Sequence, residues 1–198
     1  MKILGITGPT GSGKSLLCQY LRDMGIHCID ADKVYHSMLI PPSECLDALR
    51  LAFGDEIFAP DGMLDRSQLG KIVFSSPEKL ELLNSTVLKR VIARINDMLS
   101  ELEKQGASTV AIDAPTLIES GFHKECNAVI SVLADQHIRQ NRIIERDAIT
   151  KEKAELRINA QKHNDFYLEN SDFVIYNNGD PKKFESDIIS LLAKAGIK

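Results

Sequence analysis

The sequence predicts an α/β fold built on a parallel sheet of five strands, and two observations support this. Short apolar segments rich in β-branched residues alternate with stretches of helical periodicity, which is the pattern of βαβ units. A glycine-rich loop, GPTGSGKS, joins the first apolar segment to the first helical one. The 198 residues suffice for one α/β domain with a small helical insertion, and two independent folds would be a tight fit.

The chain begins with a strand, the loop and a helix. Residues 2–7 (KILGIT) form a short apolar run that suits a buried parallel strand. A helix is expected from Lys14 to Met24, and Gly25 stands where a left-handed residue would end it. The segment 26–30 (IHCID) then predicts the second strand.

The middle of the chain predicts a helical insertion. The segment PPSE at 41–44 interrupts the chain, and Ser76 followed by Pro77 is a typical helix start. A long helix is expected from about Pro77 to Lys104, ended by Gly106. These features place helices between the second and third strands.

The C-terminal half supplies the other three strands. Runs of β-branched and apolar residues lie at 108–113, 127–133 and 172–176, each separated from the next by helical sequence. After the last run, Asp180 is a candidate helix cap and Pro181 a first helical residue. Five strands are therefore expected.

Composition narrows the classes of partner and compartment. Twenty-four Lys and Arg against 28 Asp and Glu leave a net charge of −4, which provides no general attraction to nucleic acid or an acidic membrane. The N-terminus lacks a signal-like apolar stretch. Four cysteines without a CxxC pair indicate free thiols in a reducing compartment. We expect a cytoplasmic protein with small-molecule partners.

The glycine-rich loop is the strongest chemical signal. Its spacing matches a phosphate-binding loop between a strand and a helix, where backbone N–H groups and the positive helix end meet an anion. Lys14 is expected to reach the β- and γ-phosphates, and Ser15 to ligate Mg²⁺. The predicted nucleotide-binding residues of the loop are Gly8, Pro9, Thr10, Gly11, Ser12, Gly13, Lys14 and Ser15.

Two aspartates end predicted strands, where an open parallel sheet binds its ligands. Asp32, in the DAD segment that begins at Asp30, is a candidate for orienting or deprotonating an acceptor hydroxyl. Alternatively, Asp32 caps a helix that starts at Lys33. Asp113 is a candidate for supporting Mg²⁺, or else a turn residue at a strand end.

A cluster of arginines precedes the last strand. Arg139, Arg142 and Arg146 share one face of a predicted helix, with Arg157 on the next helical segment. Such a face could close over a triphosphate, although the interleaved acidic residues also permit a plain salt-bridged helix. The NNGDP turn at 177–181 could lie near the base of a nucleotide, and ordinary turn chemistry also explains its composition.

Together these motifs resemble the dephospho-coenzyme A kinase family over nearly the whole chain. The segments that carry the resemblance are GITGPTGSGKS, GIHCIDADKV, DGMLDRSQLGKIVFSSPEKLELLN, APTLIESG, RIIERDAITKEKAELRINAQ and SDFVIYNNG. The resemblance implies a three-layer P-loop fold like that of nucleoside monophosphate kinases. Its parts would be a core at about 1–31, 106–134 and 171–198, a helical acceptor region at about 32–105 and a helical lid at about 135–170.

The resemblance also implies an activity and roles for particular residues. The activity is ATP-dependent phosphorylation of the ribose 3′-hydroxyl of dephospho-CoA, with Mg²⁺ accompanying ATP. Asp32 would be the catalytic aspartate, with Lys14 and Arg142 acting on the phosphates. Arg146 would bind nucleotide from the lid, and Asn177 would lie near adenine.

Three departures from the family pattern stand out. Leu88 and Lys89 replace a usual His-Pro, Pro115-Thr116-Leu117 replaces a usual Pro-Leu-Leu, and Arg139 replaces a common glutamine. They leave the loop and Asp32 intact and bear more on the acceptor side than on ATP binding.

Two other functions remain open at this stage. A kinase of another small alcohol or nucleotide would share the loop, which does not read the acceptor. A GTP-binding switch is disfavoured because the chain has no N-K-x-D guanine-reading segment and no D-x-x-G switch segment.

Overall fold

The computed structural model describes residues 1–197, which divide into two compact units. The sheet unit comprises Met1–Ile29 and the chain from Leu102 onward. The helical unit comprises Asp30–Glu101. No helix among the residues described is long and apolar enough to span a membrane.

The sheet unit contains one five-stranded sheet with the order β2-β3-β1-β4-β5. β1 pairs in parallel with β3 and β4, and β4 pairs in parallel with β5. The strands are β1 (Lys2–Thr7), β2 (His27–Asp30), β3 (Thr109–Asp113), β4 (Ala128–Leu133) and β5 (Phe173–Tyr176). The predicted fold class and all five strands are confirmed, because local apolar runs bounded by turn residues specify buried strands well.

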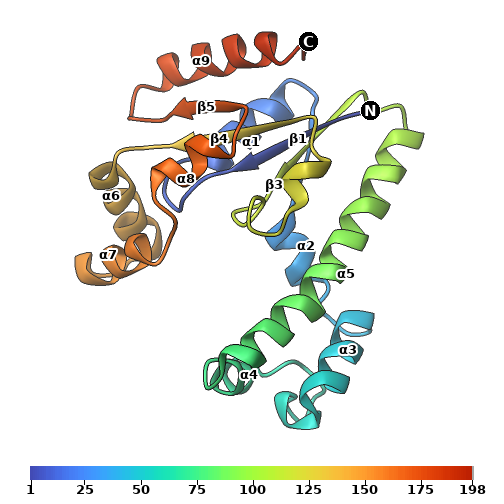
Figure 1. Cartoon of the computed structure of the whole chain (residues 1–198). Coiled ribbons are helices and arrows are strands. Elements are labelled where there is room, and N and C mark those ends of the chain that lie inside the picture. Colours follow the sequence, from blue (N-terminus) through green and yellow to red (C-terminus); the bar gives the residue numbers. More distant parts are fainter. Residues whose placement is uncertain (198) are drawn as a thin grey trace. The chain divides into compact units, whose positions relative to one another are not determined.

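Helices α1 (Lys14–Asp23) and α9 (Pro181–Lys194) pack on one face of this sheet, and Figure 1 shows α9 running along β5. Their apolar stripes, which include Leu17, Leu21 and Phe184, join inward-facing residues of the strands in one core. α8 (Asn164–Glu169) and the 3₁₀ helix η2 (Phe122–Glu125) belong to the same unit. Tyr167 of α8 forms a smaller core with residues of β4 and β5.

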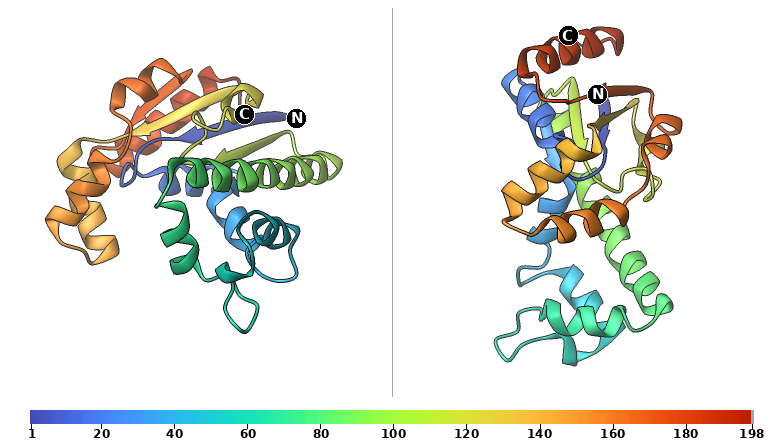
Figure 2. Two further views of the ribbon diagram at one scale, coloured as in Figure 1. Left: turned by 60° about the horizontal axis from the view of Figure 1, so that its bottom comes forward. Right: turned by 90° about the vertical axis from the view of Figure 1, so that its left-hand side faces the viewer.

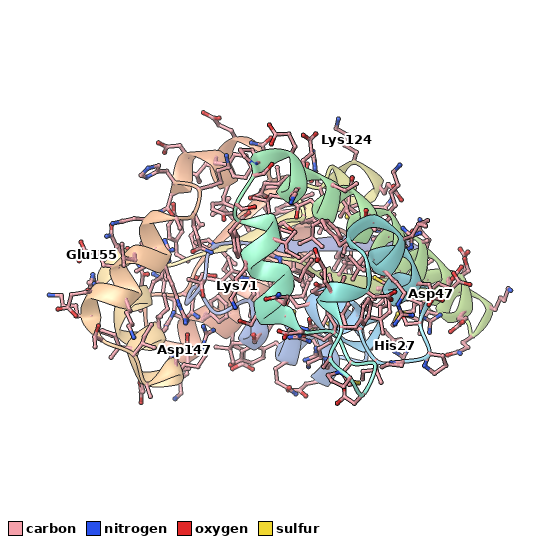
Figure 3. All side chains as sticks on the ribbon, turned by 90° about the horizontal axis from the view of Figure 1, so that it is seen from below. His27, Asp47, Lys71, Lys124, Asp147 and Glu155 are labelled. Carbon is pink, nitrogen blue, oxygen red and sulfur yellow. The ribbon has the colours of Figure 1, made fainter. Side chains whose placement is uncertain are left out.

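Helices α6 (Gln136–Asp147) and α7 (Lys151–Asn159) form an antiparallel pair after β4. Ile143, Ala154 and Ile158 are buried between them. Figures 1 and 2 show this pair beyond the carboxyl ends of β4 and β5, and Figure 3 labels Asp147 and Glu155 on it. The pair therefore lies at the edge of the sheet where ligands bind in open parallel sheets.

The helical unit is built from four helices and a short 3₁₀ turn. These are α2 (Ala31–Ser37), α3 (Glu44–Phe53), η1 (Asp55–Ile57), α4 (Arg66–Val73) and α5 (Pro77–Lys104), whose last residues reach the sheet unit. Leu49, Ile57 and Leu69 are buried in its core, against apolar residues from the first half of α5. Figure 2 shows α3 and α4 gathered beside that half of α5. The predicted long helix has the bounds expected from its proline and glycine signals.

Candidate nucleotide-binding site

The loop between β1 and α1 is shaped by three glycines with positive φ. Their φ angles are 136° at Gly8, 76° at Gly11 and 103° at Gly13, values that other residues rarely adopt. A Cβ on Gly8 would lie 2.2 Å from the carbonyl oxygen of Val132, and one on Gly13 would lie 2.0 Å from Asn177 Nδ2. Glycine is thus required both by the turn and by the close approach of neighbouring segments.

The first turn of α1 presents backbone N–H groups without a competing side chain. Its N-cap is Gly13, which makes no side-chain hydrogen bond, and no acidic residue occupies the first turn. An uncapped helix N-terminus that follows a glycine loop attracts anions through its N–H groups and its dipole. The geometry therefore suits phosphate oxygens at this end of α1.

Donor side chains hold the carbonyl groups of the loop from outside. Arg139 Nε donates to the Thr10 carbonyl at 2.9 Å, and Asn177 Nδ2 donates to the Ser12 carbonyl at 3.0 Å. Arg142 donates to the carbonyls of Gly11 and Ser12 at 3.2 and 3.3 Å, and to Asn177 Oδ1 at 3.2 Å. The loop is therefore anchored by α6 and by the segment after β5.

Burial affects two of these cations. Arg139 is only 5% exposed, whereas Arg142 is half-buried. Burial lowers the pKa of both Arg139 and Arg142 from the ordinary arginine value, which is so high that both keep their charge at neutral pH. Two positive charges therefore lie directly against the loop.

Lys14 and Ser15 occupy the start of α1. Lys14 Nζ donates to the carbonyl of Gly8 at 2.8 Å, which holds its side chain back across the loop. Ser15 is exposed in the first turn. Both residues thus belong to the loop that the sequence singled out.

Asp113 ends β3 next to the start of the loop. In the register of β1 with β3, Asp113 pairs with Ile6, which lies two residues before Gly8. Cys18 Sγ donates to Asp113 Oδ2 at 3.5 Å. Because Ser15 lies three residues before Cys18 on α1, its hydroxyl stands one turn along the same helix face. The direct contact between α1 and Asp113 is therefore the one made by Cys18, one turn after Ser15.

The thiol of Cys18 is held in its protonated form. Its hydrogen bond with Cys28, its burial and the Asp113 carboxylate all raise the pKa of Cys18 above the ordinary value. Cys28 Sγ lies 3.5 Å from the carbonyl oxygen of Cys18. All four cysteines are free thiols, as the sequence indicated.

The first aspartate of the DAD segment, and not the second, caps the helix that follows. The N-cap of α2 is Asp30, whose Oδ1 accepts from the backbone N–H of Lys33 at 3.0 Å. The alternative that Asp32 caps this helix is wrong, because α2 begins two residues earlier than Lys33, at Ala31. Asp32 is exposed in the first turn, and its carboxylate makes no hydrogen bond or ion pair within residues 1–197.

The arginines expected on one helix face have different environments. Arg146 is exposed and forms a two-pronged ion pair with Asp147, at 2.8 and 3.0 Å. Arg157 of α7 also pairs with Asp147. The hydrogen bond from Arg146, reinforced by the charge of Arg157, lowers the pKa of the Asp147 carboxyl. Arg139 and Arg142 contact the loop, whereas Arg146 and Arg157 form an ion-pair cluster.

Gln161 is a residue of the site that sequence reasoning missed. Its Oε1 accepts from the backbone N–H of Thr10 at 2.9 Å and from Arg139 at 3.0 Å. It follows α7 in a polar segment where a glutamine carries no spacing or periodicity signal. It is the last residue of the segment RIIERDAITKEKAELRINAQ that carries the family resemblance, and the fold, which brings this segment against the loop, shows what it contacts.

Comparisons with known proteins agree with this geometry. A sequence profile of the family described as dephospho-CoA kinase matches residues 2–183. A protein named dephospho-CoA kinase from Dehalococcoides mccartyi is 36% identical over 198 residues, covering 100% of this chain and 99% of the relative. Another of that name, from Corynebacterium glutamicum, is 34% identical and covers 96% of each chain.

Solved structures show the same architecture. The structure of TT1252 from Thermus thermophilus superposes with a TM-score of 0.83 at 29% identity, covering 98% of this chain and 97% of that one. Shikimate kinase from Acinetobacter baumannii has a TM-score of 0.55 at 13% identity, covering 100% and 96%, a likeness of fold alone. The profile match and the full-length relatives lead to one conclusion: this chain belongs to the dephospho-CoA kinase family.

Proposed function

We propose that this chain transfers the γ-phosphoryl group of ATP to the ribose 3′-hydroxyl of dephospho-CoA, giving coenzyme A and ADP, the last step of coenzyme A synthesis. The observation that carries the proposal is the loop at 8–15, whose carbonyls are held from outside while the N-terminus of α1 stays uncapped, in a chain of this family. Such a loop binds the phosphates of a nucleotide.

On the nucleotide side, the loop residues Gly8, Pro9, Thr10, Gly11, Ser12, Gly13, Lys14 and Ser15 bind the β- and γ-phosphates. Lys14 and Arg142 neutralise charge on the transferring phosphoryl group. Arg146, exposed on the α6–α7 pair, binds nucleotide from the lid. Asn177 holds the Ser12 carbonyl, and in this proposal it lies near adenine together with the turn that follows it.

On the acceptor side, Asp32 orients the 3′-hydroxyl and accepts its proton as the oxygen attacks the γ-phosphorus. The bond from that phosphorus to the bridging oxygen of ADP then breaks. The role is supported by the position of Asp32 in the family motif and by its exposed, unengaged carboxylate. In this proposal, residues of about 32–105 bind the acceptor and residues of about 135–170 form the lid.

Ser15 and Asp113 are the residues that would hold Mg²⁺. Hydroxyl and carboxylate oxygens suit this ion, which usually takes one or two protein ligands together with substrate phosphates. Within the described chain there is no group of three or more His, Cys, Asp or Glu residues that could hold a metal alone, which agrees with such a shared site. When bound, the ion neutralises phosphate charge. We place the reaction in the cytoplasm, which suits the four free thiols.

The test is ADP release with Mg-ATP, comparing dephospho-CoA with adenosine, nucleoside monophosphates and no acceptor. Release stimulated by dephospho-CoA, with a product heavier by one phosphate, is the expected result. Stimulation by a different acceptor would replace the proposed substrate. Retained ATP binding without stimulation by any acceptor would overturn the acceptor assignment.

The role of Asp32 is tested separately by Asp32→Asn. This change should leave ADP binding intact and lower turnover by about a hundredfold or more. Glu185→Gln, on the exposed side of α9, is the control for the loss of one surface carboxylate and should retain wild-type turnover. Near-normal turnover of Asp32→Asn would remove Asp32 from the mechanism.

A further inference from the structure

Arg139, Gln161 and Thr10 form a closed ring of hydrogen bonds. Arg139 Nε donates to the Thr10 carbonyl at 2.9 Å, while a terminal nitrogen of the same guanidinium donates to Gln161 Oε1 at 3.0 Å. The same Oε1 accepts from the Thr10 backbone N–H at 2.9 Å. Both backbone polar groups of Thr10 are therefore held by one pair of side chains.

The ring determines the direction of a peptide group. In a trans peptide the C=O and the following N–H point in opposite directions. When Arg139 holds the Thr10 carbonyl on the side of α6, the N–H of Gly11 faces the other way. The bonds from Asn177 and Arg142 to the Ser12 carbonyl orient the N–H of Gly13 in the same manner. Neither N–H has a protein acceptor in the described part of the chain.

Arg139 is also an unusual cation for its position. It is 5% exposed and makes no ion pair among residues 1–197. Only neutral oxygens, those of Thr10 and Gln161, receive its hydrogen bonds. A buried cation without a carboxylate partner is costly, and an incoming anion would relieve this cost. A polyphosphate in the adjacent loop would be such an anion.

The loop and α6 are in direct contact at this point. A Cβ on Gly11 would lie 2.8 Å from the backbone carbonyl oxygen of Arg139. Position 139 is also one of the three departures from the family pattern, with arginine in place of a common glutamine. These departures are expected to bear mainly on the acceptor side, but the structure places Arg139 against the glycine-rich loop. A guanidinium spans two acceptors at once through separate nitrogens, as the ring requires, whereas a glutamine has one terminal NH₂ group.

We propose that Arg139 is a positioning residue that, through Gln161, locks the Thr10–Gly11 peptide so that the loop is organised for nucleotide phosphates before they arrive. The proposal rests on ATP as the phosphoryl donor of the proposed function. It assigns Arg139 no contact with the reacting atoms. Because the ring joins α6 and the segment after α7 to the loop, the lid and the phosphate site are organised together.

The variants Arg139→Lys, Gln161→Ala and their combination test this ring, with ADP binding measured by calorimetry. Each single change should weaken ADP binding about tenfold, equivalent to about one strong hydrogen bond. Because both changes break the same ring, the combination should weaken binding little more than either alone. Arg139→Gln, which keeps a single donor nitrogen and also loses the positive charge, should weaken ADP binding at least as much as Arg139→Lys. Lys194→Ala removes an exposed charge from α9 and should bind within twofold of wild type.

Two further readouts separate positioning from general loss of structure. Circular dichroism confirms that each variant is folded at the assay temperature, and the KM for ATP should rise while the KM for the acceptor stays unchanged. Equal effects on both KM values, additive losses of about a hundredfold, or ADP binding within twofold of wild type in both single variants would overturn the proposal. ADP binding needs no acceptor, so absent turnover with dephospho-CoA would contradict the proposed function and leave this test valid.

Discussion

Replacement of Gly13 by alanine should destabilise the protein through two separable effects. The residue has φ of 103°, and a non-glycine residue in such a conformation costs about 1–3 kcal/mol. The added Cβ would also lie 2.0 Å from Asn177 Nδ2, which forces that side chain to move. Asn177 would then lose its bonds to Ser12 and Arg142, worth about 1 kcal/mol each. We expect Gly13→Ala to cost about 3–5 kcal/mol in total.

A double-mutant cycle with Asn177→Ala tests this division. Alone, Asn177→Ala should cost about 2 kcal/mol for the two lost hydrogen bonds. In the double variant the collision is absent, so only the backbone strain adds to that loss, and the total should be about that of Gly13→Ala alone. The two changes should therefore fall short of additivity by about 2 kcal/mol.

Urea unfolding followed by far-ultraviolet circular dichroism is the suitable assay, because the chain contains no tryptophan. The unfolding free energies of the wild type, both single variants and the double variant complete the cycle. Additivity within about 0.5 kcal/mol would refute the reasoning, since it would mean that Gly13 and Asn177 do not interact. A cost below about 1 kcal/mol for Gly13→Ala would show that its conformation is not strained.

Four further outcomes are expected elsewhere in the sheet unit. Gly5→Ala would place a Cβ 2.5 Å from Leu117 Cδ2 and 2.9 Å from Cys126 Sγ. In urea titrations this change should lower the unfolding free energy by about 1–3 kcal/mol. An unchanged unfolding midpoint would contradict the close packing at Gly5. Burial raises the pKa of Cys126 to about 12. At pH 8, iodoacetamide should therefore modify Cys126 at least about tenfold more slowly than an unstructured peptide thiol, as followed by mass spectrometry. Equal modification rates would disprove the raised pKa. The same shift makes the Cys126 contribution to stability constant below pH of about 9 and lost as the pH rises toward 12, because the unfolded thiol ionises first; Cys126→Ala should flatten the stability profile over that range. Asp180→Ala removes the helix cap whose carboxylate accepts from the backbone N–H groups of Lys182 and Lys183. In urea titrations this change should lower the unfolding free energy by about 1 kcal/mol, whereas Asp180→Asn should retain most of the stability.

The strands and the phosphate loop could be predicted because their signals are local. Each apolar run lies between turn residues, and the glycines of the loop indicate backbone conformations with positive φ that other residues rarely adopt. The cap of α2 could not be assigned in the same way. Asp30 and Asp32 are both suitable caps by residue type, and the choice depends on the residue at which the helix begins.

The arginines of α6 show a different limit. Helical spacing correctly places Arg139, Arg142 and Arg146 on one helix, but it assigns them a common face and a common role. In the folded chain Arg139 is buried against Thr10, whereas Arg146 is exposed beside Asp147. Periodicity reports the direction of a side chain from its own helix and carries no information about which segment packs there.

By itself, the sequence therefore determined the α/β class, the five strands, the position of the glycine-rich loop and the likeness to one kinase family. The tertiary structure alone decided how the loop is held: Arg139, Gln161 and Asn177 come from segments more than a hundred residues away and meet at Thr10 and Ser12. The physical reason is that local backbone preferences are written in adjacent residues, whereas hydrogen bonds to a loop carbonyl depend on which distant segments the sheet brings beside it.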